Sequence, residues 1–106
     1  MAFDVVSEVN DGIAKITMGG ELDASVAGEF KSAIEEVAQE NPTRLILMVD
    51  QLKFMASAGL RVLIFAKQKM GENVDIYVVA PQKPVLGTLE MSGFAQAVYI
   101  TETMPE

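Results

Sequence analysis

The chain has 106 residues, enough for one domain with a single hydrophobic core, and 50% of them are apolar, which is typical of a compact soluble protein. It contains no cysteine and no histidine, so disulfides, thiolate or imidazole metal ligands and imidazole-based acid/base catalysis are excluded. The net charge of −7 argues against nucleic-acid binding, because affinity for a phosphate backbone requires an extended basic surface.

The first predicted elements form a β-hairpin. Residues 3–9 and 13–18 are short β-type runs separated by Asn-Asp-Gly, whose residues tolerate the positive φ angles of a tight hairpin turn. Residues 19–21, Gly-Gly-Glu, are expected to end the second strand.

An amphipathic helix is predicted next, over residues 23–40. Its apolar residues recur at spacings of three and four, Asp23 is expected to cap its first amides, and Asn41-Pro42 to end it. Residues 44–50 form a nearly continuous apolar run that ends in an acid, which predicts a central strand buried on both faces.

The second half of the sequence continues the alternation of helices and strands. It predicts a helix over 60–70, a strand over 74–80, a short helix over 83–94 and a last strand over 97–100. The order of all these elements implies an α/β fold with a mixed sheet covered by helices.

Ser57 lies between a predicted strand and a predicted helix, and three roles are open to it. It could cap the helix, with its hydroxyl accepting a hydrogen bond from an amide of the first turn. It could be a nucleophile, but this requires a nearby base, and Met55 stands where the G-x-S-x-G motif has its first glycine. It could accept a phosphoryl group, which a helix N-terminus favours and which Lys53 and Arg61 could approach.

No metal, cofactor or membrane segment is expected. The acids Asp11, Glu21, Asp23 and Asp50 are scattered over loops and are better explained as solvated or capping groups than as ligands of a hard cation. No apolar run approaches the ~20 residues that span a bilayer, and the N-terminus does not resemble a secretory signal, so we expect a cytoplasmic protein. Most methionines are expected in the core, with Met55 partly exposed.

The segment LILMVDQLKFMASAGLRVLIFAKQ, residues 45–68, resembles the core of the STAS domain, the fold of bacterial anti-sigma-factor antagonists. Residues 19–30, GGELDASVAGEF, resemble an early block of that family, and residues 85–94, VLGTLEMSGF, resemble a late one. The resemblance covers essentially the whole chain. Ala56 stands where many family members have aspartate.

The resemblance implies one STAS domain over residues 1–106, with a mixed sheet of about five strands and helices mainly on one face. It implies an antagonist, not an enzyme, that binds a serine-kinase anti-sigma factor. The kinase would use ATP to phosphorylate Ser57 and end the complex, and a metal-dependent, PP2C-type phosphatase would restore it. The expected partner surface consists of Glu21, Asp23, Ala24, Met55, Ala58, Gly59, Leu60 and Arg61.

Other functions remain open at this point. A constitutive, non-phosphorylated STAS interaction or sensor module would account for Ala56 simply. A small anion- or nucleotide-binding domain would use the helix N-terminus near Ser57 as its site. A hydrolase with Ser57 as the nucleophile is the most distant alternative.

Overall fold

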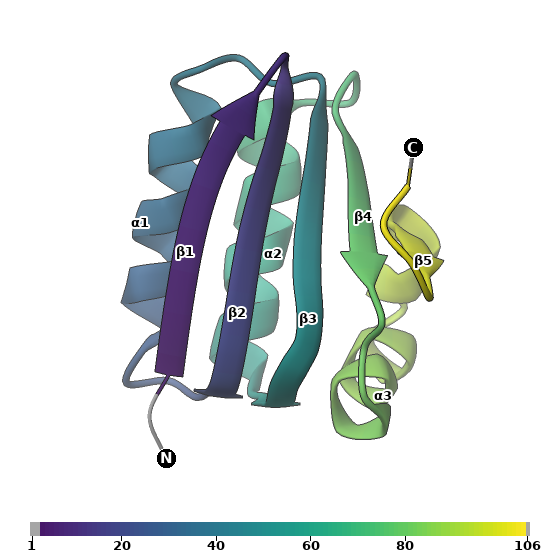
Figure 1. Cartoon of the computed structure of the whole chain (residues 1–106). Helices are drawn as coiled ribbons and strands as arrows, with labels where there is room; N and C mark the ends of the chain where they lie inside the picture. Colours follow the sequence, from purple (N-terminus) through teal and green to yellow (C-terminus); the bar gives the residue numbers. More distant parts are fainter. Residues whose placement is uncertain (1–2, 106) are drawn as a thin grey trace.

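The protein forms one five-stranded mixed sheet, seen in a computed structural model that describes residues 3–105. The strands lie in the order of the sequence; β1 and β2 are antiparallel and all other neighbours are parallel (Figure 1). The strands are β1 (Phe3–Asn10), β2 (Ile13–Leu22), β3 (Arg44–Met55), β4 (Asp75–Val79) and β5 (Tyr99–Thr101). The predicted hairpin is confirmed, with Asp11 and Gly12 both at positive φ in its turn.

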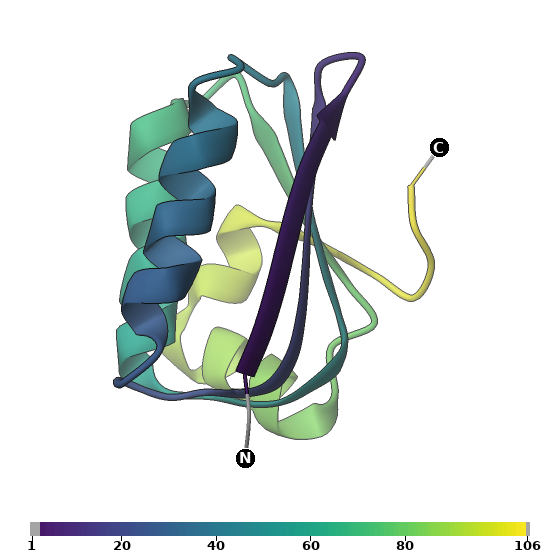
Figure 2. The same ribbon diagram turned by 60° about the vertical axis from the view of Figure 1, so that its left-hand side comes forward.

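The helices cover one face of the sheet, as the sequence predicts (Figure 2). They are α1 (Ala27–Ala38), α2 (Ser57–Met70) and α3 (Lys83–Ser92), followed by the 3₁₀ turn η1 (Phe94–Ala97). The predicted α/β fold is therefore confirmed. None of the helices in residues 3–105 is both long and apolar enough to cross a membrane.

The core lies between the sheet and this helical layer. Phe30 of α1, Leu63 of α2 and Leu89 of α3 are fully buried against inward-facing residues of the central strands, such as Leu45 and Leu47. No polar or charged side chain of residues 3–105 is buried. Burial of this apolar set is the main stabilising contribution and fixes the starts of α1 and α2 relative to the sheet.

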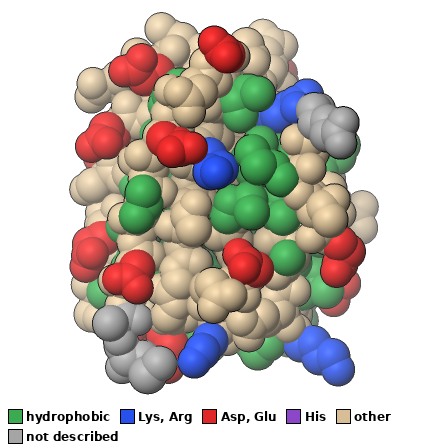
Figure 3. Space-filling model, in the orientation of Figure 1, with side chains coloured by type: hydrophobic (Ala, Val, Ile, Leu, Met, Phe, Trp, Pro, Cys, Tyr) green, Lys and Arg blue, Asp and Glu red, His purple; other side chains and the backbone are tan. Residues whose placement is uncertain are grey.

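No helix formed by residues 3–105 covers the opposite face of the sheet, and apolar side chains gather over part of it (Figure 3). The rings of Tyr77 and Tyr99 stack across β4 and β5 with centroids 5.0 Å apart. The guanidinium of Arg44 lies 5.1 Å from the centroid of Tyr77. Ile46, on the same face, is fully buried. Large amphipathic side chains thus shield this face without a second helical layer.

The strands β2 and β3 continue further than the sequence indicated. The expectation that Gly-Gly-Glu ends the second strand is wrong: β2 runs to Leu22, and β3 runs past Asp50 to Met55. The pairing has two register shifts, at each of which β3 contains one extra residue. Gly20, with φ at 88°, lies at the second of them, so this glycine accommodates the irregular pairing and does not end the strand.

Candidate functional site at the ends of β2 and β3

The site is built where two neighbouring parallel strands end together. Leu22 and Met55 are the last residues that pair between β2 and β3. The amide of Ala56 then donates a hydrogen bond of 2.8 Å to the carbonyl of Leu22. Because adjacent strands lie about 4.8 Å apart, the segments that lead into α1 and α2 leave the sheet side by side (Figure 1).

Ser57 is the first residue of α2, and its side chain is exposed. The helix cap is Ala56, whose carbonyl accepts hydrogen bonds from the amides of Gly59 and Leu60 at 3.0 and 3.2 Å. The interpretation of Ser57 as the cap is therefore wrong, because the residue lies one position inside the helix, and no side chain caps α2. The Ser57 hydroxyl makes no hydrogen bond to any residue in 3–105.

This geometry does not provide an activated nucleophile. Within residues 3–105, no carboxylate or lysine is hydrogen-bonded to the Ser57 hydroxyl, so no base is in position to take its proton. Arg61 follows one turn later on the same face of α2 and is exposed. The site presents an exposed hydroxyl, amides of the first helical turn and one guanidinium, which together suit a phosphoryl group.

Asp23 begins the connection to α1 but does not cap the helix. Its Oδ1 accepts hydrogen bonds from the amide of Ser25 at 2.9 Å and from the Ser25 hydroxyl at 2.6 Å. Helix α1 begins later, at Ala27, with Val26 as its cap, so the predicted start at Asp23 is wrong. The hydrogen bond from the Ser25 hydroxyl is the main cause of a lowered pKa at Asp23.

Most of the residues expected at the partner surface lie at this end of the molecule with exposed or partly exposed side chains; they are Glu21, Asp23, Ala24, Ala58, Leu60 and Arg61. Two others do not. Met55 is only 3% exposed, and Gly59, in the first turn of α2, is buried. The expected partial exposure of Met55 is wrong, because β3 continues to this residue and its side chain points into the core.

The last part of β3 is fixed from its second side by α3. Pairing between β3 and β4 ends at Met48 and Val79, so later carbonyls of β3 have no strand partner on that side. The side-chain amide of Gln82 donates to the carbonyl of Asp50 at 2.8 Å, and the Thr88 hydroxyl donates to the carbonyl of Met55 at 3.2 Å. Backbone groups freed by the shortened neighbour are thus satisfied by side chains.

Three exposed residues at or near the site were missed by the sequence interpretation. Phe54 is 43% exposed, next to the buried Met55. Ile64 is 38% exposed and lies seven residues after Ser57, a spacing that returns to the same helical face. Gly28 has no atom within 4 Å of the position where a Cβ would lie, so the start of α1 presents bare backbone. Of these three residues, only Ile64 could have been placed near Ser57 from the sequence, by its spacing along the helix.

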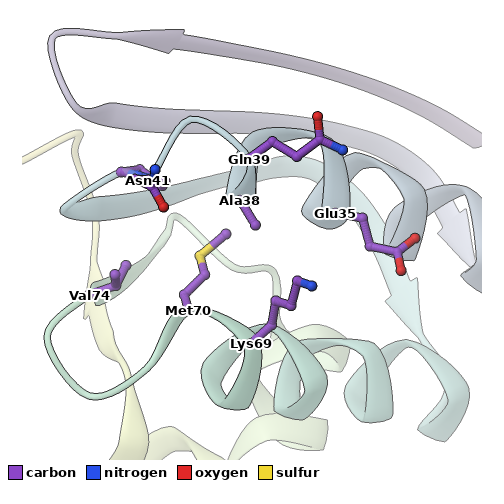
Figure 4. Close-up of a pocket in the computed structure, with 8 residues that line it drawn as sticks. Glu35, Ala38, Gln39, Asn41, Lys69, Met70 and Val74 are labelled. Atoms are coloured by element: carbon purple, nitrogen blue, oxygen red, sulfur yellow. The ribbon is translucent and has the colours of Figure 1, made fainter.

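A cavity lies at the other ends of α1 and α2. It has a volume of about 750 Å³, and Ala38, Lys69, Met70 and Val74 are among the residues that line it (Figure 4). No group of three or more acidic residues in 3–105 is arranged to hold a metal ion. Neither feature adds a ligand site next to Ser57.

Replacing Ala56 with aspartate is expected to stabilise the fold by about 1 kcal/mol, because the carboxylate would accept hydrogen bonds from amides of the first turn of α2 that no side chain now caps. Urea unfolding of both proteins measures the difference in the free energy of unfolding. The slope of this free energy against urea concentration should be the same for both proteins. Ala56→Asn is the matched variant without charge and should give a similar gain. A loss of stability in both variants would contradict the cap geometry.

Comparison with known proteins places this architecture in a family. The sequence model of the STAS domain matches residues 4–106. Two sequences named anti-sigma-F factor antagonist RsfB, from Mycobacterium tuberculosis strains CDC 1551 / Oshkosh and ATCC 25618 / H37Rv, are each 30% identical over 95 residues. These alignments cover 90% of this chain and 78% of each relative. The protein belongs to the STAS domain family.

Solved structures share the fold at low sequence identity. An anti-sigma factor antagonist from Mycobacterium paratuberculosis superposes with a TM-score of 0.88 at 23% identity, over 97% of this chain and 88% of that one. The antagonist SpoIIAA in its unphosphorylated form gives 0.79 at 20% identity, over 96% and 89%. SpoIIAA of Bacillus in the phosphorylated form gives 0.71 at 20% identity, over 96% and 92%.

Proposed function

We propose that this protein is an anti-sigma-factor antagonist that binds a serine-kinase anti-sigma factor while Ser57 is free, and that phosphorylation of Ser57 ends the complex. The observation that carries the proposal is the exposed Ser57 hydroxyl, without a hydrogen-bond partner, at the start of α2. The relative RsfB, named an anti-sigma-F factor antagonist, supports the class of function.

The surroundings of Ser57 suit a site that another protein must reach. Ala24, Gly28 and Ala58 present only small side chains or none, so a kinase active site can approach the hydroxyl without displacing bulky groups. An added phosphate of charge about −2 is favoured by the helix N-terminus and by Arg61 as long as water surrounds it. Within a protein interface the same charge loses its hydration, which disfavours the complex.

In this proposal the chain is a substrate and a ligand, and it catalyses nothing. Ser57 has no base in hydrogen-bonding position, so the kinase supplies the catalytic groups and ATP the phosphoryl group. A PP2C-type phosphatase removes it and restores binding. We place these steps in the cytoplasm, without a nucleic-acid or membrane partner.

Phosphorylation is tested by incubating the protein with its cognate kinase and ATP and measuring the intact mass. One added phosphoryl group is expected on the wild type and none on Ser57→Ala. Ser32→Ala is the matched control, because Ser32 is an exposed serine in the middle of α1, outside the expected partner surface, and it should be modified like the wild type. An unmodified wild type would indicate a constitutive STAS interaction module instead.

A further inference from the structure

Phe54 is a large apolar side chain left exposed near the switch serine. It is 43% exposed, and none of the ring contacts among residues 3–105 involves it. Tyr99, another exposed aromatic residue, stacks on Tyr77. Phe54 therefore offers apolar area that the fold itself does not use, and aromatic residues with such area are typical anchors of protein interfaces.

The backbone that carries Phe54 is held on both sides. On one side Phe54 pairs in register with Glu21 of β2. On the other, the Thr88 hydroxyl binds the carbonyl of the next residue, Met55, whose side chain is buried. A partner that binds Phe54 would not have to order this segment first, which lowers the entropic cost of association.

Phe54 is close enough to Ser57 for one partner to contact both. Phe54 lies three positions before Ser57 in the sequence, so their Cα atoms are at most about 11 Å apart. A typical interface buries about 800 Å² on each partner. A round patch of that area is about 30 Å across, which is much more than the distance between these two residues. A surface centred on the first turn of α2 therefore reaches the end of β3.

The charges around Phe54 indicate the chemistry of the partner. Lys53 precedes it and is exposed, and Glu21, which pairs in register with Phe54, is partly exposed. Neither forms a salt bridge with a residue in 3–105. A complementary surface would combine an apolar pocket with a carboxylate for Lys53 and a basic side chain for Glu21 at its border.

We propose that Phe54 is the apolar anchor of the docking surface for the anti-sigma factor and that it inserts into an apolar pocket bordered by a carboxylate and a basic side chain, the partners of Lys53 and Glu21. This inference rests on the proposed function, because it assigns a contact to the same partner. The docking surface thus extends from the starts of α1 and α2 around the end of β3. The side chain sets affinity and does not take part in phosphoryl transfer.

Phe54→Ala should weaken binding of the unphosphorylated protein to the kinase by at least about tenfold, measured by calorimetry. Phosphorylation should slow at low protein concentration and recover at saturating concentration, because the anchor affects docking and not the Ser57 hydroxyl. Phe54→Leu keeps an apolar side chain and should retain most of the affinity. Thermal unfolding checks that each variant folds.

Val6→Ala is the matched control, because Val6 is 65% exposed on β1 and lies in the middle of a strand. It should bind like the wild type. Wild-type affinity in Phe54→Ala, with Ser57 still phosphorylated, would overturn the anchor and leave the proposed function standing. A wild type that neither binds the kinase nor gains a phosphoryl group would overturn both. Sedimentation showing that Phe54 instead holds two copies of this chain together would also overturn the anchor.

Discussion

Ser57→Asp is expected to weaken binding to the anti-sigma factor by more than about a hundredfold while the fold stays intact. The carboxylate would lie at the first turn of α2, where the helix dipole favours a negative charge in the free protein. In the complex the same group would be buried without a partner, and an uncompensated buried charge costs about 3–5 kcal/mol. Calorimetric titration of the kinase with each protein measures the ratio of the two affinities.

Ser32→Asp is the matched control for this experiment. Ser32 is exposed in the middle of α1, four residues before Glu36, which accepts a hydrogen bond from the hydroxyl of Ser7 on β1. It therefore lies on the side of α1 that faces away from α2, and the same substitution there should leave the affinity unchanged. Equal affinities of the wild type and Ser57→Asp would contradict a switch that acts through charge.

Gly59→Ala is expected to destabilise the protein by about 1–3 kcal/mol, although alanine is the better helix former. A Cβ at this position would lie 2.7 Å from Cγ and Cδ2 of Leu22 and 3.2 Å from Cγ of Met55. Both of these side chains are buried in the core, so they cannot move aside without disturbing its packing. The midpoint temperature of thermal unfolding should fall by roughly 5 °C per kcal/mol.

Gly28→Ala is the control with the same chemical change at the start of the neighbouring helix. No atom lies within 4 Å of its Cβ position, so only the gain in helix propensity remains, about 0.5–1 kcal/mol of stabilisation. The two glycines should therefore respond with opposite signs. If both variants were stabilised, the close contact between α2 and Leu22 would not exist in solution.

The sequence predicts the order and type of the elements because each has a local signal. The Asn-Asp-Gly turn determines the hairpin, and the spacing of apolar residues identifies the helices. Its errors about where β2 and β3 end have a single physical origin: the two bulges in β3 were not recognised. They allow Leu52 to point into the core between exposed neighbours, and the resulting run of inward residues at spacings of three has no simple strand or helix period.

The same error explains the outcome at Phe54 and Met55. Treating the residues after Asp50 as a connection left no means of deciding which of the two neighbours faces water. Alternation from the buried Leu52 would place Phe54 inside, and the second bulge, which adds one residue to β3 between these two positions, turns Phe54 outside and Met55 inside. The hydrogen bonds from Gln82 and Thr88 could not be predicted, because they join positions more than 30 residues apart and depend on where α3 packs.

The hydrogen bonds that fix the segment before Ser57 determine what kind of signal this protein can carry. A switch that works by a conformational change typically has about 0.1–10% of its molecules in the minor conformation. This fraction sets the activity of the switch when no signal is present. Here the carbonyls of Asp50 and Met55 and the amide of Ala56 are all hydrogen-bonded to neighbouring elements, which favours a single arrangement of the segment. In the proposed function, a phosphoryl group on Ser57 would be a covalent record, and the background activity would depend on how completely the kinase and the phosphatase act.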